Sequence, residues 1–240
     1  MTNVRAIFQN IMNEIQFQFD VFPPGGEWSY QPLPWINLNR VKRGQGTKSR
    51  FEAIEASLAG LSISSGMDIG CHVGYFCFAM AQKGIPMLGI DVDPRSIRIA
   101  QYVANKIGIQ NIVFCPMAVS TATMCLLPKV DIVLLLSVWH HCVREHGFET
   151  AGQMLSAVWE RSGKVLFFES GETEMTPEFG LSAMGNSPKE WLTNYLGNSC
   201  ADSEIIHLGQ FKAFAPSGNE NRNVVYRNLF QVVRKTKASQ

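Results

Sequence analysis

Residues 67–76 read MDIGCHVGYF, and this stretch decides the fold. It places Asp68, Gly70 and Gly74 in the spacing D-x-G-x-x-x-G, the outline of a glycine-rich loop that joins a strand to a helix. Cys71 and His72 stand where many such loops carry another glycine, and both are metal-ligand types. The stretch could therefore be a nucleotide-binding loop, a metal site, or only the turn between a strand and a helix.

The chain around this loop alternates between strand-like and helix-like segments. We expect a first strand that ends at residues 65–70, further strands over residues 87–92, 111–119, 131–138 and 164–170, and helices over residues 73–84, 94–108, 148–163 and 187–197. Strands that are apolar throughout are typical of parallel sheets covered on both faces. Residues 204–211 and 224–235 have no helix between them and predict a final hairpin. The pattern predicts an α/β, Rossmann-like, doubly wound and mostly parallel seven-stranded sheet with a C-terminal antiparallel hairpin.

The segment before this alternation has a different composition. Residues 3–20 have apolar side chains at helical spacing, residues 22–35 are rich in Pro, Gly and aromatics, and residues 47–58 predict a helix. We therefore divide the chain into a lid-like N-terminal extension, residues 1–46, and a main domain, residues 47–240.

The overall composition is that of a globular protein. Hydrophobic residues make up 46% of the 240 residues, and 21 basic residues nearly balance 20 acidic ones, which gives no global argument for nucleic acid binding. A local basic run is either a solvated surface or a site for an anion; it comprises Arg40, Lys42, Arg43, Lys48 and Arg50. The N-terminus lacks the apolar core of a signal peptide and no segment has the length of a membrane span, so we expect a cytoplasmic protein with six reduced cysteines.

The charge of the glycine-rich loop restricts its ligand. Pyrophosphate-binding loops use the spacing G-x-G-x-x-G, and a carboxylate such as Asp68 would repel a pyrophosphate but attract an amine. Asp91 lies 21 residues after Gly70, at the end of the second strand, where a carboxylate can accept the hydroxyls of a ribose. The loop therefore favours a ligand with an amine and a ribose but no phosphate.

With these motifs, residues 62–170 resemble the class I S-adenosylmethionine-dependent methyltransferases. The resemblance implies that the methionine part of S-adenosylmethionine lies among Asp68, Gly70, Cys71, His72 and Gly74. It implies that Asp91 binds the ribose, with Val92 beside it, and that Met117 and Ala118 flank the adenine. Ser137, near the end of the fourth strand, is also assigned to the cofactor. No acid stands near Met117, so backbone and apolar contacts would recognise the adenine.

Two clusters could instead bind a metal. Cys71 and His72 lack partner ligands at metal spacing, and we interpret them as loop residues whose backbone binds the ligand. His140, His141, Cys142 and His146 could converge on a metal only through an unusual turn. We expect no metal site.

The sequence after the fourth strand, SVWHHCVREHG, is on the side where such enzymes receive their substrate. His140 and His141 are the candidate catalytic residues, acting as a general base or only orienting the substrate. Trp139, Arg144 and Glu169 are the candidate substrate-binding residues, although Glu169 could equally anchor a histidine or a lid arginine.

This segment, with Tyr30, Gln31 and Arg50, is also similar to the methyltransferase part of the kinase–methyltransferases that cap bacterial O-antigens. That resemblance implies that Tyr30, Gln31 and Arg50 close over the cofactor and that the acceptor is a phosphate on a glycan. The sequence departs from the pattern because no kinase region follows.

We expect a methyltransferase acting on an oxygen acceptor, such as a phosphate or hydroxyl of a glycan or phosphorylated sugar. The alternatives are a methyltransferase of small metabolites at oxygen or nitrogen, and a binding module that keeps the fold without catalysis. The loop spacing and Asp68 disfavour a nicotinamide-dependent oxidoreductase, and a nucleic-acid methyltransferase has less support still.

Overall fold

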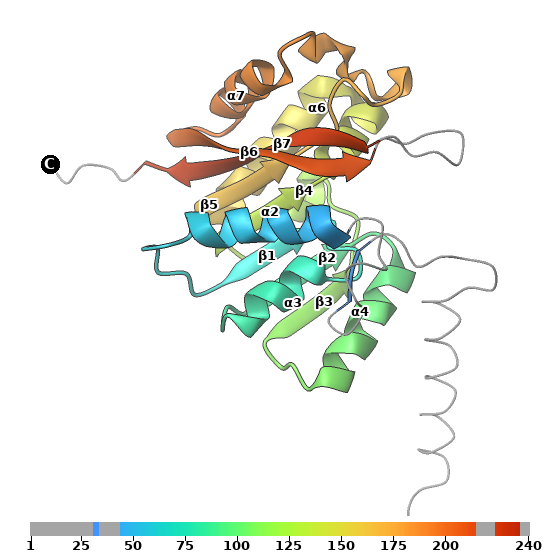
Figure 1. The fold of residues 1–240 in the computed structure, drawn as a ribbon, viewed down its shortest axis with the longest axis vertical. Helices are drawn as coiled ribbons and strands as arrows, with labels where there is room; N and C mark the ends of the chain where they lie inside the picture. Colours follow the sequence, from blue (N-terminus) through green and yellow to red (C-terminus); the bar gives the residue numbers. More distant parts are fainter. Residues whose placement is uncertain (1–30, 34–43, 215–223, 236–240) are drawn as a thin grey trace, which may run out of the picture.

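The computed structural model describes residues 31–33, 44–214 and 224–235. Its centre is a seven-stranded sheet in the order β3-β2-β1-β4-β5-β7-β6 (Figure 1). Five strands are parallel, and their bounds are β1 Gly66–Ile69, β2 Met87–Asp91, β3 Ile112–Pro116, β4 Val130–Leu136 and β5 Ser162–Glu169. Next to β5, the sheet continues with β7 (Val224–Arg234), which is antiparallel to β5. The edge strand is β6 (Ser203–Phe214), which is antiparallel to β7. The expected fold class is confirmed.

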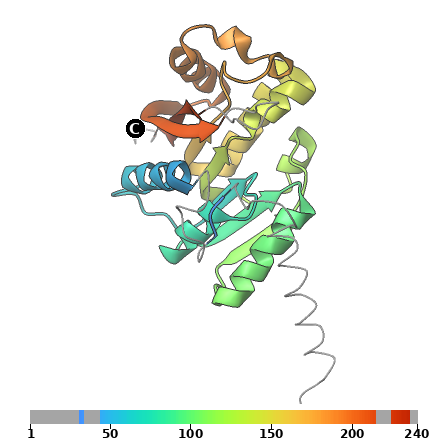
Figure 2. The same ribbon diagram turned by 45° about the vertical axis from the view of Figure 1, so that its right-hand side comes forward.

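Helices cover both faces of this sheet. Their bounds are α2 Gly44–Ser57, α3 Tyr75–Gln82, α4 Pro94–Ile107, α5 Thr121–Met124, α6 Trp139–Arg161 and α7 Pro188–Ser199, with short 3₁₀ turns η2 at Pro177–Phe179 and η3 at Leu181–Met184. Figures 1 and 2 both show the β6–β7 hairpin between α2 on one side and α7 on the other. None of the described helices combines the length and the apolar composition needed to cross a membrane.

The alternation of side chains along β4 builds two cores. Ile132, Leu134 and Leu136 pack with α2, α3 and α4, whereas Val133 and Leu135 pack with α5, α6 and α7. Successive side chains of a strand point to opposite faces, so the unbroken apolar run of β4 supplies both cores at once. The apolar strands therefore fix the layered arrangement.

The helix ends agree in part with the sequence patterns. Asp93 caps α4 by accepting the backbone N–H groups of Arg95 and Ser96, and Gly108 ends that helix in the left-handed conformation. Helix α2 begins at Gly44, three residues before the expected start, so the proposed boundary between residues 46 and 47 falls inside its first turn. The expected helix over residues 3–20, Tyr30, and the basic residues Arg40, Lys42 and Arg43 lie outside the described residues.

The fold brings the site to the edge where the strand order reverses. β1 lies between β2 and β4. The chain runs from β1 outward through β2 to β3 on one side, and then returns to β4 on the other side of β1, so the strand order reverses between β1 and β4. Ligands of doubly wound sheets bind at this point, beyond the carboxyl ends of the strands.

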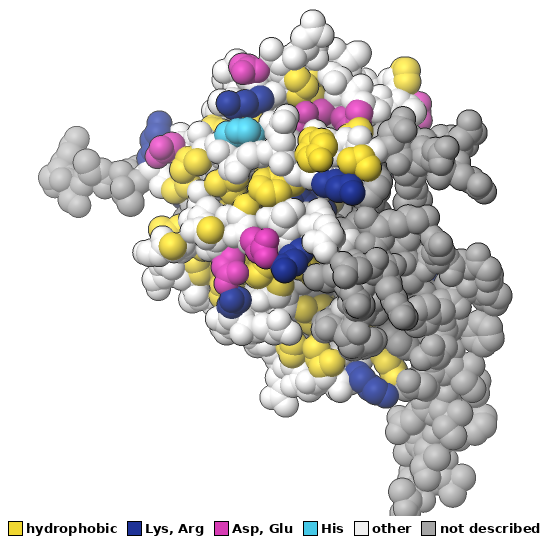
Figure 3. Space-filling view, in the orientation of Figure 1, with side chains coloured by type: hydrophobic (Ala, Val, Ile, Leu, Met, Phe, Trp, Pro, Cys, Tyr) yellow, Lys and Arg dark blue, Asp and Glu magenta, His cyan; other side chains and the backbone are white. Residues whose placement is uncertain are grey.

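On the face seen in Figure 3, acidic and basic side chains are interspersed, and Lys48 pairs with Glu52 across 3.5 Å.

Candidate active site

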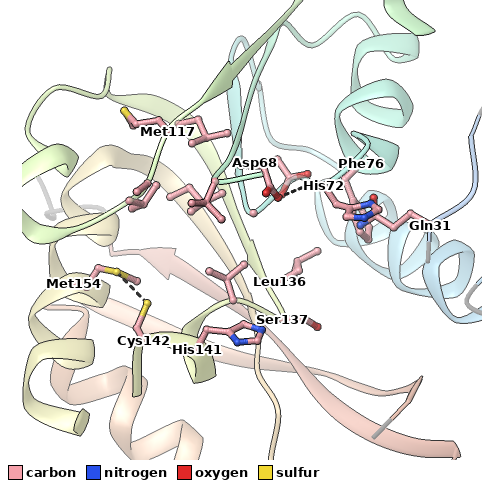
Figure 4. A pocket seen from close by; sticks show the side chains of 18 of the residues that line it. Gln31, Asp68, His72, Phe76, Met117, Leu136, Ser137, His141, Cys142 and Met154 are labelled. Carbon is pink, nitrogen blue, oxygen red and sulfur yellow. Dashed lines mark hydrogen bonds between the residues drawn. The ribbon is translucent and has the colours of Figure 1, made fainter. Parts of the chain in front are cut away.

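A cavity of about 460 Å³ lies at the carboxyl ends of β1, β2 and β4. Figure 4 shows Gln31, His72 and Phe76 along one side of it, with Met117 and the Cys142–Met154 pair across from them. Asp68 lies between these two sides, and Ser137 and His141 lie near the end of β4. The cavity thus has a polar side, an apolar side and a histidine.

The loop between β1 and α3 forms one wall. Gly70 has φ +77°, and a Cβ atom there would lie 2.2 Å from Cγ2 of Val138, so only glycine fits. Gly74 has φ +86° and packs against Phe114, where an added Cβ atom would lie 2.6 Å from the ring. His72 also adopts the left-handed conformation, with φ +51°. These three residues give the loop its tight backbone turn.

Two carboxylates flank the loop. Both oxygens of Asp91 accept backbone N–H groups, Oδ2 from His72 at 2.8 Å and Oδ1 from Asp93 at 2.9 Å. A carboxylate oxygen can accept more than one hydrogen bond, so Asp91 keeps acceptor capacity toward the cavity. Asp68 is only 2% exposed, and the thiol of Cys77 donates to it across 3.8 Å. Burial, with the nearby charge of Asp91, raises the pKa of Asp68 to about 7.

The opposite side of the cavity is apolar. It is lined by Val92, Met117, Ala118, Val119, Val138, Cys142 and Met154. The Cys142 thiol donates to the Met154 sulfur across 3.3 Å, and burial raises the pKa of Cys142 to about 11. A neutral thiol and two thioethers provide a polarisable, uncharged surface that suits a flat aromatic ring.

A buried arginine closes the polar side. Arg50 Nη1 donates to Glu169 Oε1 across 2.8 Å, and the Ser137 hydroxyl donates to the same oxygen across 2.6 Å. Arg50 and Ser137 line the cavity, whereas Glu169 is fully buried behind them at the end of β5. Arg227 donates to Ser137 Oγ across 3.4 Å and is paired with Glu174 across 2.8 Å. Charged groups therefore form a connected chain behind this wall.

The two adjacent histidines have different surroundings. His140 is 3% exposed, and its Nδ1 accepts the backbone N–H of Gly171 at 2.9 Å, which occupies that nitrogen. His141 lines the cavity. Burial, then the positive charge of Arg144, lowers the pKa of His141 from its ordinary value. A neutral imidazole facing the cavity can accept a proton, so His141 is the better placed of the two as a base.

The structure brings most of the expected site residues together. The cavity is lined by Gln31, Arg50, Asp68, Gly70, His72, Asp91, Val92, Met117, Ala118, Ser137, His141 and Arg144. Four others contribute from behind it: Cys71 and His140 are buried, Gly74 shapes the loop, and Glu169 anchors Arg50. Of the two alternatives for Glu169, its contact with Arg50 favours anchoring an arginine.

The expectation for Trp139 is not met by the geometry. Its side chain is fully buried and packs edge-on against Phe168 and Tyr195, while its Nε1 donates to the carbonyl of Ala151. The residue opens α6 and points into the core, so it cannot touch a substrate in the cavity. Sequence position beside His140 and His141 was a misleading guide, because neighbouring residues of a helix point in different directions.

Several residues in or behind the cavity wall were not found from the sequence. Thr47 precedes Arg50 by one turn of α2, so helical spacing from Arg50 could have found it. Phe76 lies in the first turn of α3 and is not at helical spacing from Gly74. Arg227 comes from β7, and only the strand order brings it beside Ser137. Within the described part of the chain, no group of three His, Cys, Asp or Glu side chains is arranged to hold a metal.

A family model described as "Methyltransferase domain" matches residues 64–156, which include β1, the loop, Asp91 and the histidines. This segment is similar to a methyltransferase domain. The chain is 29% identical over 115 residues to the ubiquinone biosynthesis O-methyltransferase of Leptothrix cholodnii, covering 48% of this chain and 45% of that protein. It is also 29% identical over 91 residues to the O-antigen chain terminator bifunctional methyltransferase/kinase WbdD of Escherichia coli, covering 38% of this chain and 13% of that protein.

Solved structures share the fold of this chain over most of its length. WbdD in complex with a kinase inhibitor has a TM-score of 0.64 at 22% identity, covering 85% of this chain and 45% of that one. Magnesium protoporphyrin IX methyltransferase of Synechocystis PCC 6803, with bound SAM, has a TM-score of 0.60 at 18% identity, covering 93% and 97%. The chain spans less than half the length of the curated relatives it matches.

Proposed function

We propose that the protein is an S-adenosylmethionine-dependent methyltransferase that acts on an oxygen acceptor. The observation that supports this proposal best is the pair of carboxylates, Asp68 and Asp91, at the ends of β1 and β2. The loop beside them needs glycine at position 70. Asp68 offers a negative charge to an amine, and Asp91 offers two oriented oxygens to a diol. The methyltransferase domain match supports the same assignment.

The remaining walls fit the other parts of that cofactor. Arg50 offers N–H donors to a carboxylate at the polar side, and Gln31, also in the cavity wall, adds an amide there. The uncharged surface around Met117 and Met154 suits an adenine ring. A ligand that carries an amino acid at one end, a ribose in the middle and a base at the other end matches this order of groups.

The cofactor, when bound, supplies a methyl group on a sulfonium, which an acceptor oxygen attacks while the neutral thioether leaves. The protein holds the reacting groups in line, which is its main contribution to such a displacement. His141 lines the cavity and can take the proton of an acceptor hydroxyl, because its lowered pKa keeps it neutral near pH 7.

The acceptor is proposed to be a hydroxyl or a phosphate oxygen of a glycan or phosphorylated sugar. The name of one relative, an O-methyltransferase, supports an oxygen acceptor, and the name of the other, an O-antigen chain terminator, supports a glycan. Arg144 in the cavity wall could orient an anionic group. The neutral state of His141 favours a hydroxyl, because a phosphate oxygen is already ionised and needs no base.

An acceptor panel tests this proposal. Matched phosphorylated and unphosphorylated sugars, a phenol and an amine are each incubated with the protein and labelled S-adenosylmethionine. Transfer to oxygen acceptors, with little to the amine, is the expected result. Transfer only to the amine would contradict the oxygen assignment. Cofactor binding with no transfer to any acceptor would favour a binding module instead.

A further inference from the structure

Glu169 takes no direct part in the cavity, yet two cavity residues depend on it. Its carboxylate is fully buried at the end of β5. Oε1 accepts hydrogen bonds from Arg50 of α2 and from Ser137 beyond the end of β4, at 2.8 and 2.6 Å. The backbone carbonyl of Glu169 also accepts the N–H of Ser137 at 2.8 Å. One residue thus joins a helix on one face of the sheet to the end of a neighbouring strand.

Arg50 is held by more than this ion pair. Its Nε donates to the carbonyl of Gly46 at 3.1 Å, and Nη2 donates to Thr47 Oγ1 at 3.4 Å. A guanidinium has five N–H donors, and these contacts together with the one to Glu169 use three of them. Among the described residues, two N–H groups of Arg50 therefore remain for a ligand in the cavity that Arg50 lines.

We propose that Glu169 is a positioning residue, which fixes the guanidinium of Arg50 so that its remaining N–H groups bind the carboxylate of the cofactor. A long arginine side chain loses conformational freedom when it is ordered, and a buried partner that orders it beforehand removes that cost from binding. This inference rests on the proposed function, because it assumes a cofactor with a carboxylate.

The negative charge of Glu169 sets the expected size of the effect on cofactor binding. Glu169→Gln keeps the shape but replaces a charge-assisted acceptor of Arg50 with a neutral amide. Hydrogen bonds to charged groups are worth roughly tenfold to a hundredfold in an equilibrium constant, and we expect the Kd for S-adenosylmethionine to rise by about tenfold or more. Glu169→Asp, which keeps the charge but moves it away from Arg50, should give a smaller rise.

Asp131→Asn is the matched control. Asp131 lies near the start of β4, at the other end of the same strands, and its carboxylate also has two partner residues: it accepts two hydrogen bonds from Ser64 and pairs with Lys164 of β5. The substitution therefore removes a comparable carboxylate from the same pair of strands, far from Arg50. We expect the Kd for the cofactor to stay within about twofold of wild type.

The decisive experiment is a double-mutant cycle read by calorimetric titration with S-adenosylmethionine. If Glu169 acts through Arg50, then Glu169→Gln should change the Kd by less than about twofold in an Arg50→Met background. An equal loss in both backgrounds, or an unchanged Kd in the single variant, would overturn the proposal. Thermal unfolding without cofactor verifies that each variant is folded. If Glu169→Gln does not fold, Glu169→Asp replaces it in the double-mutant cycle. Failure of the wild type to bind the cofactor is a separate result, which would overturn the proposed function itself.

Discussion

The backbone N–H of His72 donates to Asp91 Oδ2 across 2.8 Å, which joins the loop after β1 to the acid that ends β2. His72 reaches this position through a left-handed backbone conformation, φ +51°. The loop and the carboxylate are therefore oriented with respect to each other in the protein itself. A site arranged in this way loses less freedom when a ligand binds.

Gly70 gives the first prediction. Gly70→Ala would force a side chain into the left-handed region and place its methyl group against Val138. Gly84→Ala is the control, because Gly84 has a similar φ of +83° but no atom within 4 Å of its Cβ position. We expect Gly84→Ala to lower the free energy of unfolding by about 1–2 kcal/mol from backbone strain. Gly70→Ala should lose about 1–3 kcal/mol more from overpacking. Urea unfolding measures both, and equal losses would contradict the close packing.

Asp68 gives a pH-dependent prediction. Because its pKa is raised to about 7, the buried acid binds a proton below neutrality in the free protein. A cationic ligand favours the ionised form, so binding at pH 6 should release up to about one proton, and affinity should rise with pH by up to about tenfold per unit until pH 7. Calorimetry in two buffers of different ionisation enthalpy measures the proton release.

The matched variant is Asp68→Asn, which cannot release a proton at this position. Its binding of S-adenosylmethionine should be weak and should lose the dependence between pH 5.5 and 7. A wild-type affinity that is constant over this range would show that Asp68 does not face the cationic part of the ligand. The same raised pKa predicts that the free protein loses stability as pH rises from about 4 to 7, because its folded state holds the extra proton.

His141 gives a prediction about rate. If it accepts the acceptor proton, His141→Gln should lower kcat by about 10²–10⁴-fold and leave the Kd for the cofactor within about twofold. The acid limb of the wild-type kcat profile should lie below the ordinary histidine pKa of about 6.5, because burial lowers the pKa of His141. His146→Gln, at a mostly exposed side chain on the same segment, is the control. A wild-type kcat in His141→Gln would show that the histidine only lines the cavity.

The sequence predicted the sheet because its strands are long apolar runs and its helices have clear ends. Pro94 and Gly108 delimited α4, and the missing helix between residues 211 and 224 predicted the hairpin. The glycine spacing and Asp91 located the loop and its neighbouring acid, since both follow directly from the ends of β1 and β2.

The part beyond β4 was harder to predict. The helix expected from residue 148 is present, but a second helical segment that begins at Trp139 precedes it, and non-helical Gly147, with φ +77°, separates the two. The sequence pattern did not predict the first segment, which carries the histidines. On a helix, adjacent residues point about 100° apart, which separates buried His140 from His141 in the cavity. Contacts such as Arg50 with Glu169, 119 positions apart, depend on tertiary packing and leave no local pattern.

The most direct test of the account is calorimetric titration of the wild type and Asp91→Ala with S-adenosylmethionine, with NADH as the control ligand. We expect the wild type to bind S-adenosylmethionine but not NADH. Asp91→Ala should bind it at least about tenfold more weakly, because the ribose hydroxyls lose a charged acceptor. A wild type that does not bind S-adenosylmethionine, or an Asp91→Ala variant that binds it unchanged, would contradict the assignment of this cavity to the cofactor.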